Sequence, residues 1–387
     1  MRVLKFGGKS LRSVEEIDKL AKKVSAIKDE QILIVVSAMG DATSTLIKMA
    51  ELAGPNSPSA DSQRELDMLL GSAERVSAAL FSLALQKYGR KSQSFTGSQA
   101  GILTRGPHSN ASIFQLRPIR IDECLNQEII PVVAGFQGVD PETKNITTLG
   151  RGGSDLTALF FAKHYGCSAE LYKTVGGLFS ADPNKVPKAK AIKYITPNHL
   201  ENICYWGTKA LYTKAAKLAL EFNVPLSFHD DKSFERMTQV NFTDEESLCI
   251  TQLSNVAAVA CVDKNISLGL EALEKHFNTT PFRVLASAQD QGTARFLLDF
   301  IDRDTNSLVF DNLIKPLSLN MNAISIISSL DLEDKTRKTA LSLLSDFEIK
   351  RLLESKNRMT FFIESDHSTK LIQTLHQGIV EPSQDKN

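Results

Sequence analysis

The sequence predicts an α/β protein whose open, mainly parallel sheet carries helices on both faces, followed by small α+β units. The first support is a βαβ unit, because apolar strands at residues 3–6 and 31–36 flank a glycine turn and a helix. The second is that strands and helices go on alternating to about residue 230. The third is a change of order from about residue 245, where a pattern of short strands and helices occurs twice. We therefore expect one domain at residues 1–235 and a second region at 245–387, divided into units of about 250–315 and 316–385.

The composition is that of an ordinary folded protein. The 387 residues include 45 Lys and Arg and 45 Asp and Glu, and this formal net charge of zero argues against a nucleic-acid partner held by bulk electrostatics. Five cysteines, an odd number without a C-x-x-C pair, predict reduced thiols in a cytoplasmic protein. We expect no membrane span, because no apolar run is long enough, and no signal peptide. A cytoplasmic enzyme or binding protein is expected.

The elements of the first domain follow from local patterns. A glycine turn, Gly7–Ser10, ends the first strand, and Ser13 and Glu16 have the spacing of a capping box for the next helix. A polar stretch rich in Pro and Ser, residues 54–62, is typical of a surface loop. Residues 99–112 are expected to be irregular. Further strands are expected at 92–95, 129–136, 169–172 and 224–228, and helices at 66–85, 120–126 and 156–165.

The second region has shorter elements. A strand and a helix followed by two strands occur twice, which is typical of small ligand-binding modules. The repeat lies in the order of the elements and not in the residues themselves. Strands are expected at 256–262, 282–287, 294–300, 323–328, 348–353 and 358–364, and helices at 268–277, 335–344 and 369–377.

The most informative stretch is the glycine-rich loop at Thr147–Asp155, which reads TTLGRGGSD and lies between a buried strand and the start of a helix. Glycines let backbone N–H groups approach a ligand, and the first turn of a helix has unpaired donors and a partial positive charge. Arg151 adds a planar fork that suits a carboxylate or a phosphate, so the loop predicts an anion site. The alternative is an ordinary turn in which Ser154 or Asp155 caps the helix.

Two charged side chains lie in apolar surroundings. Lys5 is part of the first apolar strand, and because an unpaired buried ammonium is costly, we expect it to face a site at the strand end. Glu74 lies among apolar residues of the long helix, where it is either solvated or faces a ligand amine. The turn at Gly7–Ser10 lacks the upstream glycine of a P-loop, because Val3 occupies that position. Residues 173–185 place a carboxylate, a hydroxyl and two lysines at strand ends, where open α/β sheets bind ligands.

Several stretches together resemble the aspartate kinases of the amino-acid kinase superfamily. The glycine-rich loop matches the family's T-T-L-G-R-G-G-S-D throughout and is the most specific of them. The matches run in the family's order over residues 1 to about 230, and the tail weakly resembles the family's ACT domains. The other motifs are K-F-G-G-T-S at residues 5–10, V-S-A-M-G-x-x-T at 36–43, S-x-G-E-R-x-S at 72–77, G-V-Y-T-A-D-P-R-x-V at 177–186 and G-A-K-V-L at 207–211.

The resemblance implies an amino-acid kinase fold for residues 1–235 and ACT-like, ferredoxin-like regulatory units after residue 245. It also implies ATP-dependent phosphorylation of the β-carboxylate of L-aspartate, the first step of the aspartate-family amino-acid pathway, with Mg2+ accompanying ATP. The catalytic residues would be Lys5 and Asp182, and the substrate-binding residues Thr43, Glu74, Phe136, Arg151 and Ser154. The nucleotide-binding residues would be Lys5, Gly7, Gly8, Ser37, Lys173, Thr174, Phe179, Lys185 and Lys209.

The resemblance also implies individual roles. Lys5 would stabilise the charge of the transferred phosphoryl group, and Asp182 would orient catalytic lysines or the metal ion. Arg151 would hold the α-carboxylate of aspartate, and Glu74 its α-amine. No residue is assigned as a direct metal ligand. An amino-acid effector at the ACT-like region and a homodimer or higher homo-oligomer are further implications.

The chain departs from the family's motifs on the nucleotide side. Lys9 and Lys173 stand where the family has threonines, and Thr174 and Gly176 stand where it has aspartates. These changes predict a more positive nucleotide site, with lysines taking part of the charge-neutralising work of magnesium. Alternatively, both lysines point to solvent and change nothing, as lysine usually does.

Two alternative functions remain at this point. One is a kinase of the same superfamily that acts on another amino acid or small carboxylate, against which Glu74, Arg151 and Thr43 argue. The other is a homologue that has lost catalysis and acts in regulation or binding. The lost aspartates at positions 174 and 176 favour the second alternative, because contacts to phosphate and metal are where such activity would fail.

Overall fold

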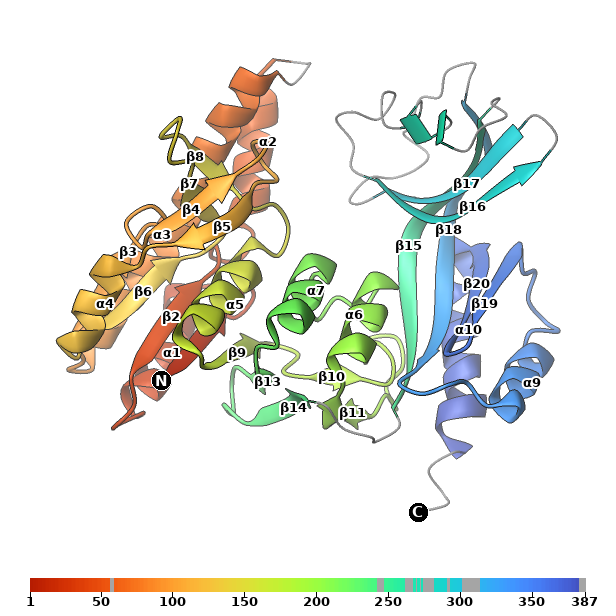
Figure 1. Cartoon of the computed structure of the whole chain (residues 1–387). Helices are drawn as coiled ribbons and strands as arrows, with labels where there is room; N and C mark the ends of the chain where they lie inside the picture. The colour runs from red at the N-terminus through yellow and green to blue at the C-terminus, as the bar shows by residue number, and fades with distance from the viewer. Residues whose placement is uncertain are drawn as a thin grey trace. The chain divides into compact units, whose positions relative to one another are not determined.

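The structure is a computed structural model (Figure 1). It describes residues 1–55, 59–241, 247–261, 267–268, 270–271, 273, 282–290, 293–300 and 314–382. The chain forms two compact units. The first contains residues 1–178, 191–201 and 209–243, and the second contains residues 179–190, 202–208 and 244–387. The domain division expected from the sequence stays a prediction.

An eight-stranded sheet forms the centre of the first unit, in the order β12-β14-β13-β9-β1-β2-β6-β3. All neighbours from β3 to β13 pair in parallel, and β13 and β14 pair antiparallel. The predicted open, mainly parallel sheet is therefore correct. The bounds are β1 (Arg2–Phe6), β2 (Ile32–Val36), β3 (Ser92–Phe95), β6 (Ile130–Ala134), β9 (Ser168–Lys173), β12 (Tyr194–Ile195), β13 (Leu226–Asp230) and β14 (Arg236–Val240).

Helices cover both faces of this sheet. Leu4 and Phe6 of β1 join one hydrophobic core with α1 (Val14–Ser25) and α3 (Ala60–Lys87). Because successive side chains of a strand point to opposite faces, Lys5 points the other way, toward α5. The remaining bounds are α2 (Ala42–Ala53), α4 (Ile119–Asn126), α5 (Gly153–Tyr165), α6 (Pro197–Tyr205) and α7 (Thr213–Phe222).

The first unit also contains a small four-stranded sheet, in the order β5-β4-β7-β8, which the sequence did not predict. Residues 99–112 were expected to be irregular, yet β4 lies within them. The strands are only three to five residues long and have no clear alternation, so they form because they pair with one another across the chain. The bounds are β4 (Ile102–Arg105), β5 (Ser112–Leu116), β7 (Gln137–Val139) and β8 (Ile146–Thr148). Because β8 leads into the glycine-rich loop, this sheet positions that loop.

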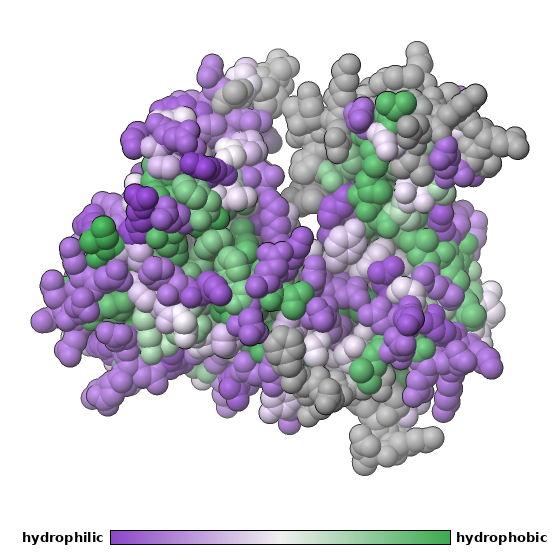
Figure 2. All heavy atoms as spheres, viewed as in Figure 1, coloured by the Kyte–Doolittle hydropathy of each residue, from purple (hydrophilic) through white to green (hydrophobic). Residues whose placement is uncertain are grey.

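The long helix α3 is apolar enough over Asp61–Lys87 to cross a membrane by length and composition, contrary to the expectation from the sequence. Half of its most apolar window is buried, and Phe81 and Leu85 belong to the core beneath the main sheet. Those contacts are what a core helix of a folded unit makes. The face of the first unit seen in Figure 2 is mostly hydrophilic, and its apolar residues form separate patches.

The second unit is built on a six-stranded antiparallel sheet, in the order β16-β17-β15-β18-β20-β19. Its strands are β15 (Leu248–Cys261), β16 (Phe282–Asp290), β17 (Thr293–Phe300), β18 (Ile314–Ser328), β19 (Arg351–Ser355) and β20 (Arg358–Glu364). Its helical segments are α9 (Asp334–Leu343), η2 (Ser365–His367), α10 (Ser368–Leu375) and η3 (His376–Val380). The two short strands β10 (Leu178–Phe179) and β11 (Ala191–Ile192) pair with each other.

Two hydrophobic cores share this sheet. Ile250 of β15 packs in a core with α9 and α10, whereas Val259 of the same strand packs in a core with Phe296 and Phe300 of β17. β18 is divided in the same way, with Ile326 in the first core and Ile314 in the second. The two long strands therefore run through both α+β halves. Most of the helix expected at 268–277 lies outside the described residues.

Candidate functional site

The turns that follow β1 and β2 are locked together at the carboxyl end of the sheet. The N–H of Gly40 donates to the carbonyl of Gly8 (3.0 Å), and Ser37 N–H donates to Phe6 (3.1 Å). A Cβ at Gly8 would lie 2.7 Å from the carbonyl oxygen of Ala38, so only glycine fits there. Two of the segments predicted to meet phosphate are thus neighbours.

A buried lysine and a buried aspartate lie beside these turns. Lys5 is 5% exposed, and its Nζ forms an ion pair of 2.6 Å with Oδ1 of Asp155 in the first turn of α5. Oδ2 of Asp155 lies 3.5 Å from Nζ of Lys173 at the end of β9. Burial alone would raise the pKa of Asp155, but the ammonium groups of Lys173 and Lys5 outweigh it and hold that pKa below its usual value. One carboxylate thus joins two cations in a Lys5–Asp155–Lys173 cluster.

Glu74 of α3 is a buried carboxyl with one oxygen available. Its Oε1 accepts the N–H of Ala38 (3.0 Å), whereas its buried Oε2 has no hydrogen-bond partner in the part of the chain that the structure describes. Burial raises the pKa of Glu74 to about 7, against the lowering effect of its backbone hydrogen bonds and of Lys5. A buried acceptor without a partner is costly, so this oxygen fits a cationic ligand group.

The glycine-rich loop adopts a backbone that requires glycine. Gly150 and Gly152 have φ angles of 70° and 71°. A Cβ at Gly153 would lie 2.8 Å from the ring of Phe136, which itself has a φ of 70°. A Cβ at Gly135 would lie 2.9 Å from that of Ser154, so β6 ends directly against the first turn of α5. Phe136 and Ser154, both predicted for the aspartate pocket, therefore lie at the same end of β6, and the strained Phe136 backbone is typical of a ligand site.

Two other residues predicted to bind the substrate aspartate are more exposed to solvent. Arg151 is exposed in the glycine-rich loop, and Thr43 is half-buried in the first turn of α2. Their predicted roles stay predictions.

The residues predicted to bind the nucleotide differ in their exposure and in the unit to which they belong. Thr174 and Lys209 are exposed residues of the first unit. Three others, Phe179, Asp182 and Lys185, belong to the second unit. There the carboxylate of Asp182 accepts the backbone and side-chain N–H groups of Asn184 (both 3.0 Å), and the Lys185 ammonium contacts Gln252. Their roles at the nucleotide stay predictions.

The roles of two Asp side chains of the protein, Asp155 and Asp67, were not predicted from the sequence. Asp155 was considered only as a helix cap, although it ends the most specific motif. Asp67 of α3 is fully buried and accepts hydrogen bonds from Thr148 Oγ1 (2.5 Å) and Ser109 N–H (3.0 Å), with His108 Nδ1 at 2.7 Å. It thereby connects α3 to Thr148, near the start of the glycine-rich loop. Charged residues of a long helix look solvated in sequence, so no signal in the sequence marked Asp67.

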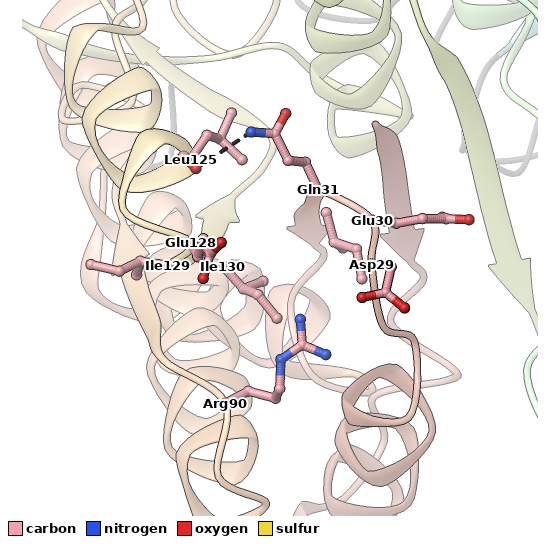
Figure 3. A pocket seen from close by; sticks show the side chains of 9 residues that line it. Asp29, Glu30, Gln31, Arg90, Leu125, Glu128, Ile129 and Ile130 are labelled. Atoms are coloured by element: carbon pink, nitrogen blue, oxygen red, sulfur yellow. Dashed lines mark hydrogen bonds between the residues drawn. The ribbon is translucent and has the colours of Figure 1, made fainter.

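A cavity of about 420 Å³ lies elsewhere in the first unit (Figure 3). It is lined by residues 29–32, 125 and 128–130 and by Arg90, whose guanidinium donates to the carbonyls of Ser25 (3.1 Å) and Ile27 (2.5 Å). These residues precede or begin β2 and β6. The cavity is therefore at the amino ends of strands whose carboxyl ends carry the candidate site.

Comparison with known proteins gives matches along the chain. Residues 1–228 match the model of the amino acid kinase family. The aspartokinase of Corynebacterium efficiens is 42% identical over 227 residues, which cover 58% of this chain and 53% of that protein. The aspartokinase of Geobacillus stearothermophilus is 38% identical over 290 residues, which cover 74% of this chain and 69% of that protein. The chain thus spans about half the length of relatives such as the first.

Two solved structures resemble the fold over 98% of this chain. Aspartokinase III of E. coli in complex with aspartate and ADP (R-state) has a TM-score of 0.84 at 18% identity, with all of that chain covered. The same enzyme in complex with lysine and aspartate (T-state) has a TM-score of 0.74 at 19% identity, with 99% covered. At these identities the likeness concerns the fold alone, and it confirms the predicted α/β sheet followed by an α+β region.

Proposed function

We propose, on the premise that the chain belongs to the amino acid kinase family and within it to the aspartokinases, that it phosphorylates L-aspartate with ATP. The γ-phosphoryl group would pass to the β-carboxylate and form 4-phospho-L-aspartate, in the first step of the pathway to aspartate-family amino acids such as lysine, threonine and methionine. The observation that carries this proposal is the buried ion pair of Lys5 and Asp155 beside the turn at Gly7–Ser10.

The chemistry suits such a site because the nucleophile needs no activation. A carboxylate is already deprotonated at neutral pH, so no strong general base is required. The main barrier is the electrostatic repulsion between this carboxylate and the polyphosphate. Fixed cations and N–H donors lower that repulsion most. Lys5 is the buried cation at this place, and Asp155 holds its ammonium in position. The backbone N–H of Gly8 would meet the phosphates, whereas that of Gly7 donates to the carbonyl of Tyr172 (3.4 Å).

Aspartate would bind between side chains that carry the charges opposite to its own. The buried Oε2 of Glu74 would accept the α-ammonium, and the guanidinium of Arg151 would hold the α-carboxylate in two parallel hydrogen bonds. Phe136, Ser154 and Thr43 would complete the pocket. Glu74 supports aspartate as the substrate because an acceptor that lacks an amine could not pair with it.

In the first unit, the nucleotide would bind at Ser37, Lys173, Thr174 and Lys209. The residues do not provide a built magnesium site, because Asp155 is already bound to two ammonium groups and Asp182 caps Asn184. Nor do the described residues contain a cluster of three His, Cys, Asp or Glu side chains. Magnesium would therefore arrive on the phosphates of ATP.

The test is ADP formation measured with aspartate, with glutamate and without an acceptor. We expect ADP with aspartate only, and aspartate β-hydroxamate when hydroxylamine displaces phosphate from 4-phosphoaspartate. Turnover with glutamate instead would favour a kinase of another amino acid. ATP binding without turnover on any acceptor would favour a regulatory homologue.

The second unit would bind an amino-acid effector, and the protein would form a homodimer or a higher homo-oligomer in the cytoplasm. Support comes from the α+β sheet with two cores, which resembles ACT domains. The five cysteines are all reduced thiols, as in a reducing compartment. Light scattering with and without lysine, threonine or methionine tests both the oligomer and the effector.

A further inference from the structure

The helix α3 contacts three segments of the candidate site along one of its faces. Asp67, Gly71 and Glu74 have the spacing i, i+4 and i+7, so they follow one another on the same side of the helix. Asp67 accepts the hydroxyl proton of Thr148 in the glycine-rich loop (2.5 Å). The carbonyl of Gly71 accepts the side-chain N–H of Gln137 in β7 (2.6 Å), and Glu74 accepts a backbone N–H of the turn after β2 (3.0 Å). One continuous helix (Figure 1) therefore fixes the spacing of these three segments.

The carboxylate of Asp67 accepts from four groups, none of which belongs to α3. Besides the Thr148 hydroxyl, these are Nδ1 of His108 (2.7 Å) and both the N–H (3.0 Å) and the hydroxyl (3.3 Å) of Ser109. The side chain of Asp67 is fully buried, and these bonds replace the water that it lost on folding. Because an ionised carboxylate has no proton to donate, Nδ1 of His108 carries the proton that they share. Asp67 thus joins the loop between β4 and β5 to the glycine-rich loop.

The loop between β4 and β5 depends on this carboxylate for its shape. Ser109 has a φ of 63°, a left-handed conformation that is unfavourable for a residue with a side chain, and its N–H and hydroxyl both donate to Asp67. The same loop lies directly on the glycine-rich loop. The N–H of Ala111 donates to the carbonyl of Thr148 (2.9 Å), and a Cβ at Gly150 would lie 3.0 Å from the carbonyl oxygen of Ser109. Loss of the carboxylate would therefore release both loops together.

We propose that Asp67 is a positioning residue of the aspartate site, which holds the glycine-rich loop at a fixed place on α3. It thereby sets the separation between Arg151, which would hold the α-carboxylate of the substrate, and Glu74, which would accept the α-ammonium. Asp67 and Glu74 are two helical turns apart, a rise of about 10 Å. Asp67 itself does not touch the substrate, because it is fully buried and protein donors occupy both of its oxygens. This proposal rests on the proposed function, because it takes L-aspartate as the ligand.

The expected effect falls on aspartate affinity and spares turnover. Without Asp67, the glycine-rich loop takes its binding-competent arrangement for only a fraction of the time, and the apparent Kd for aspartate rises by the inverse of that fraction. At saturating aspartate the bound ligand selects this arrangement, so kcat is kept. The turn at Gly7–Ser10 is held by the turn after β2 instead, through the bond from Gly40 to Gly8 (3.0 Å), so the KM for ATP should change little.

The experiment uses the full chain and compares the Kd for aspartate, measured by calorimetry, with kcat and the KM for ATP. Thr148→Val replaces the hydroxyl that binds Asp67 by a methyl group. We expect its Kd for aspartate to rise about tenfold, with kcat and the KM for ATP within about threefold of wild type. Thr148→Ser keeps the hydroxyl and should stay within about threefold of wild type for aspartate. Asp67→Asn cannot accept from all four donors and should raise the Kd for aspartate about 10- to 100-fold.

Thr104→Val is the matched control. Thr104 is as fully buried as Thr148 and lies in the same small sheet, but its hydroxyl bonds to that of Thr147 (2.6 Å) and not to Asp67. We expect this variant to lose Tm as Thr148→Val does and to keep its Kd for aspartate. An unchanged aspartate Kd in Thr148→Val would overturn the proposal, and so would an equal loss in Thr104→Val.

Equal losses for aspartate and ATP would also overturn it, because they indicate that Asp67 only supports the fold. The two Thr148 variants decide the question even if Asp67→Asn does not fold. Wild type that binds aspartate without forming 4-phosphoaspartate would overturn the proposed function alone, since the Kd for aspartate would still test Asp67. Wild type that does not bind aspartate would overturn both.

Discussion

The two sides of the predicted site are held in different ways. On the aspartate and phosphoryl side, Lys5, Glu74 and Ser154 are buried at strand ends or in helices of one unit. On the outer nucleotide side, Thr174 and Lys209 are exposed, and three further predicted residues belong to the second unit. Buried charges interact strongly and are costly to leave unpaired, whereas exposed charges are screened by water. Substitutions on the buried side should therefore have large, non-additive effects on stability and kinetics. Substitutions on the exposed side should have smaller, additive effects.

The largest effect is expected at Asp155, the carboxylate at the centre of the buried side. Asp155→Asn leaves two ammonium groups without their anion, which should lower the free energy of unfolding by about 3 kcal/mol near neutral pH. Because the pKa of Asp155 lies below its usual value, this contribution is complete above the unfolded pKa of about 3.9 and is lost as pH falls through the lower folded pKa.

Urea denaturation of both proteins at several pH values checks this expectation. The gap between wild type and Asp155→Asn should be constant from about pH 7 to about pH 5 and should shrink below about pH 4. Equal stability of the two proteins at neutral pH would show that the ion pairs contribute nothing.

Removal of Lys5 should have the next largest effect. Lys5→Ala is expected to reduce kcat by about 100-fold or more, because the ammonium acts on charge that develops in the transition state. Circular dichroism should show that the fold is kept. Lys9→Ala, at an exposed position of the same turn, is the control and should keep its kcat. Near-normal turnover of Lys5→Ala would refute the role assigned to Lys5.

Substitution of Glu74 is expected to weaken aspartate binding while it stabilises the fold. Glu74→Gln should raise the KM for aspartate about 10- to 100-fold, since one charge-assisted contact of about 1.5–3 kcal/mol is lost, and should leave the KM for ATP nearly unchanged. In wild type, kcat/KM for aspartate should rise with pH through about 7, as Glu74 ionises. Equal changes in both KM values would contradict the assignment to the substrate amine.

The same substitution should stabilise the free protein. With a pKa of about 7, folded Glu74 holds a proton that the unfolded chain releases near its ordinary value of 4.5, so stability falls as pH rises between these values. Glutamine does not titrate, so Glu74→Gln does not lose this stability. The variant should be more stable than wild type near pH 8 by on the order of 2–3 kcal/mol. A lower Tm of the variant at that pH would show that the carboxyl is paired in the free protein.

The smallest effect is expected at the exposed Arg151. Arg151→Lys keeps the charge but loses the bidentate geometry, so the KM for aspartate should rise about tenfold, or about 1.4 kcal/mol, with the Tm unchanged. Unchanged aspartate affinity would count against contact with the α-carboxylate. A loss as large as that of Glu74→Gln would remove the contrast between buried and exposed residues of the site.

Much of the first unit was predictable because its signals are local. Apolar runs produced the parallel strands, and α1 begins at Val14 directly after its cap Ser13, whose Oγ accepts the N–H of Glu16 (3.3 Å). The predicted capping box is only half formed, because the Glu16 carboxylate pairs with Arg12 and Lys19 instead. The glycine-rich loop was recognisable because three glycines and an arginine stand together in one short stretch. Lys5 was recognisable as a charge within an apolar strand.

The sequence by itself thus determined the order of strands and helices, the glycine turns and the residue types available for an anion site, because these depend on neighbours along the chain. Only the tertiary structure decided that Asp155 joins Lys5 to Lys173, that burial raises the pKa of Glu74, and that β15 and β18 serve two cores at once. These features depend on groups far apart in the sequence, and the energy of a charge or an apolar side chain depends on what surrounds it after folding.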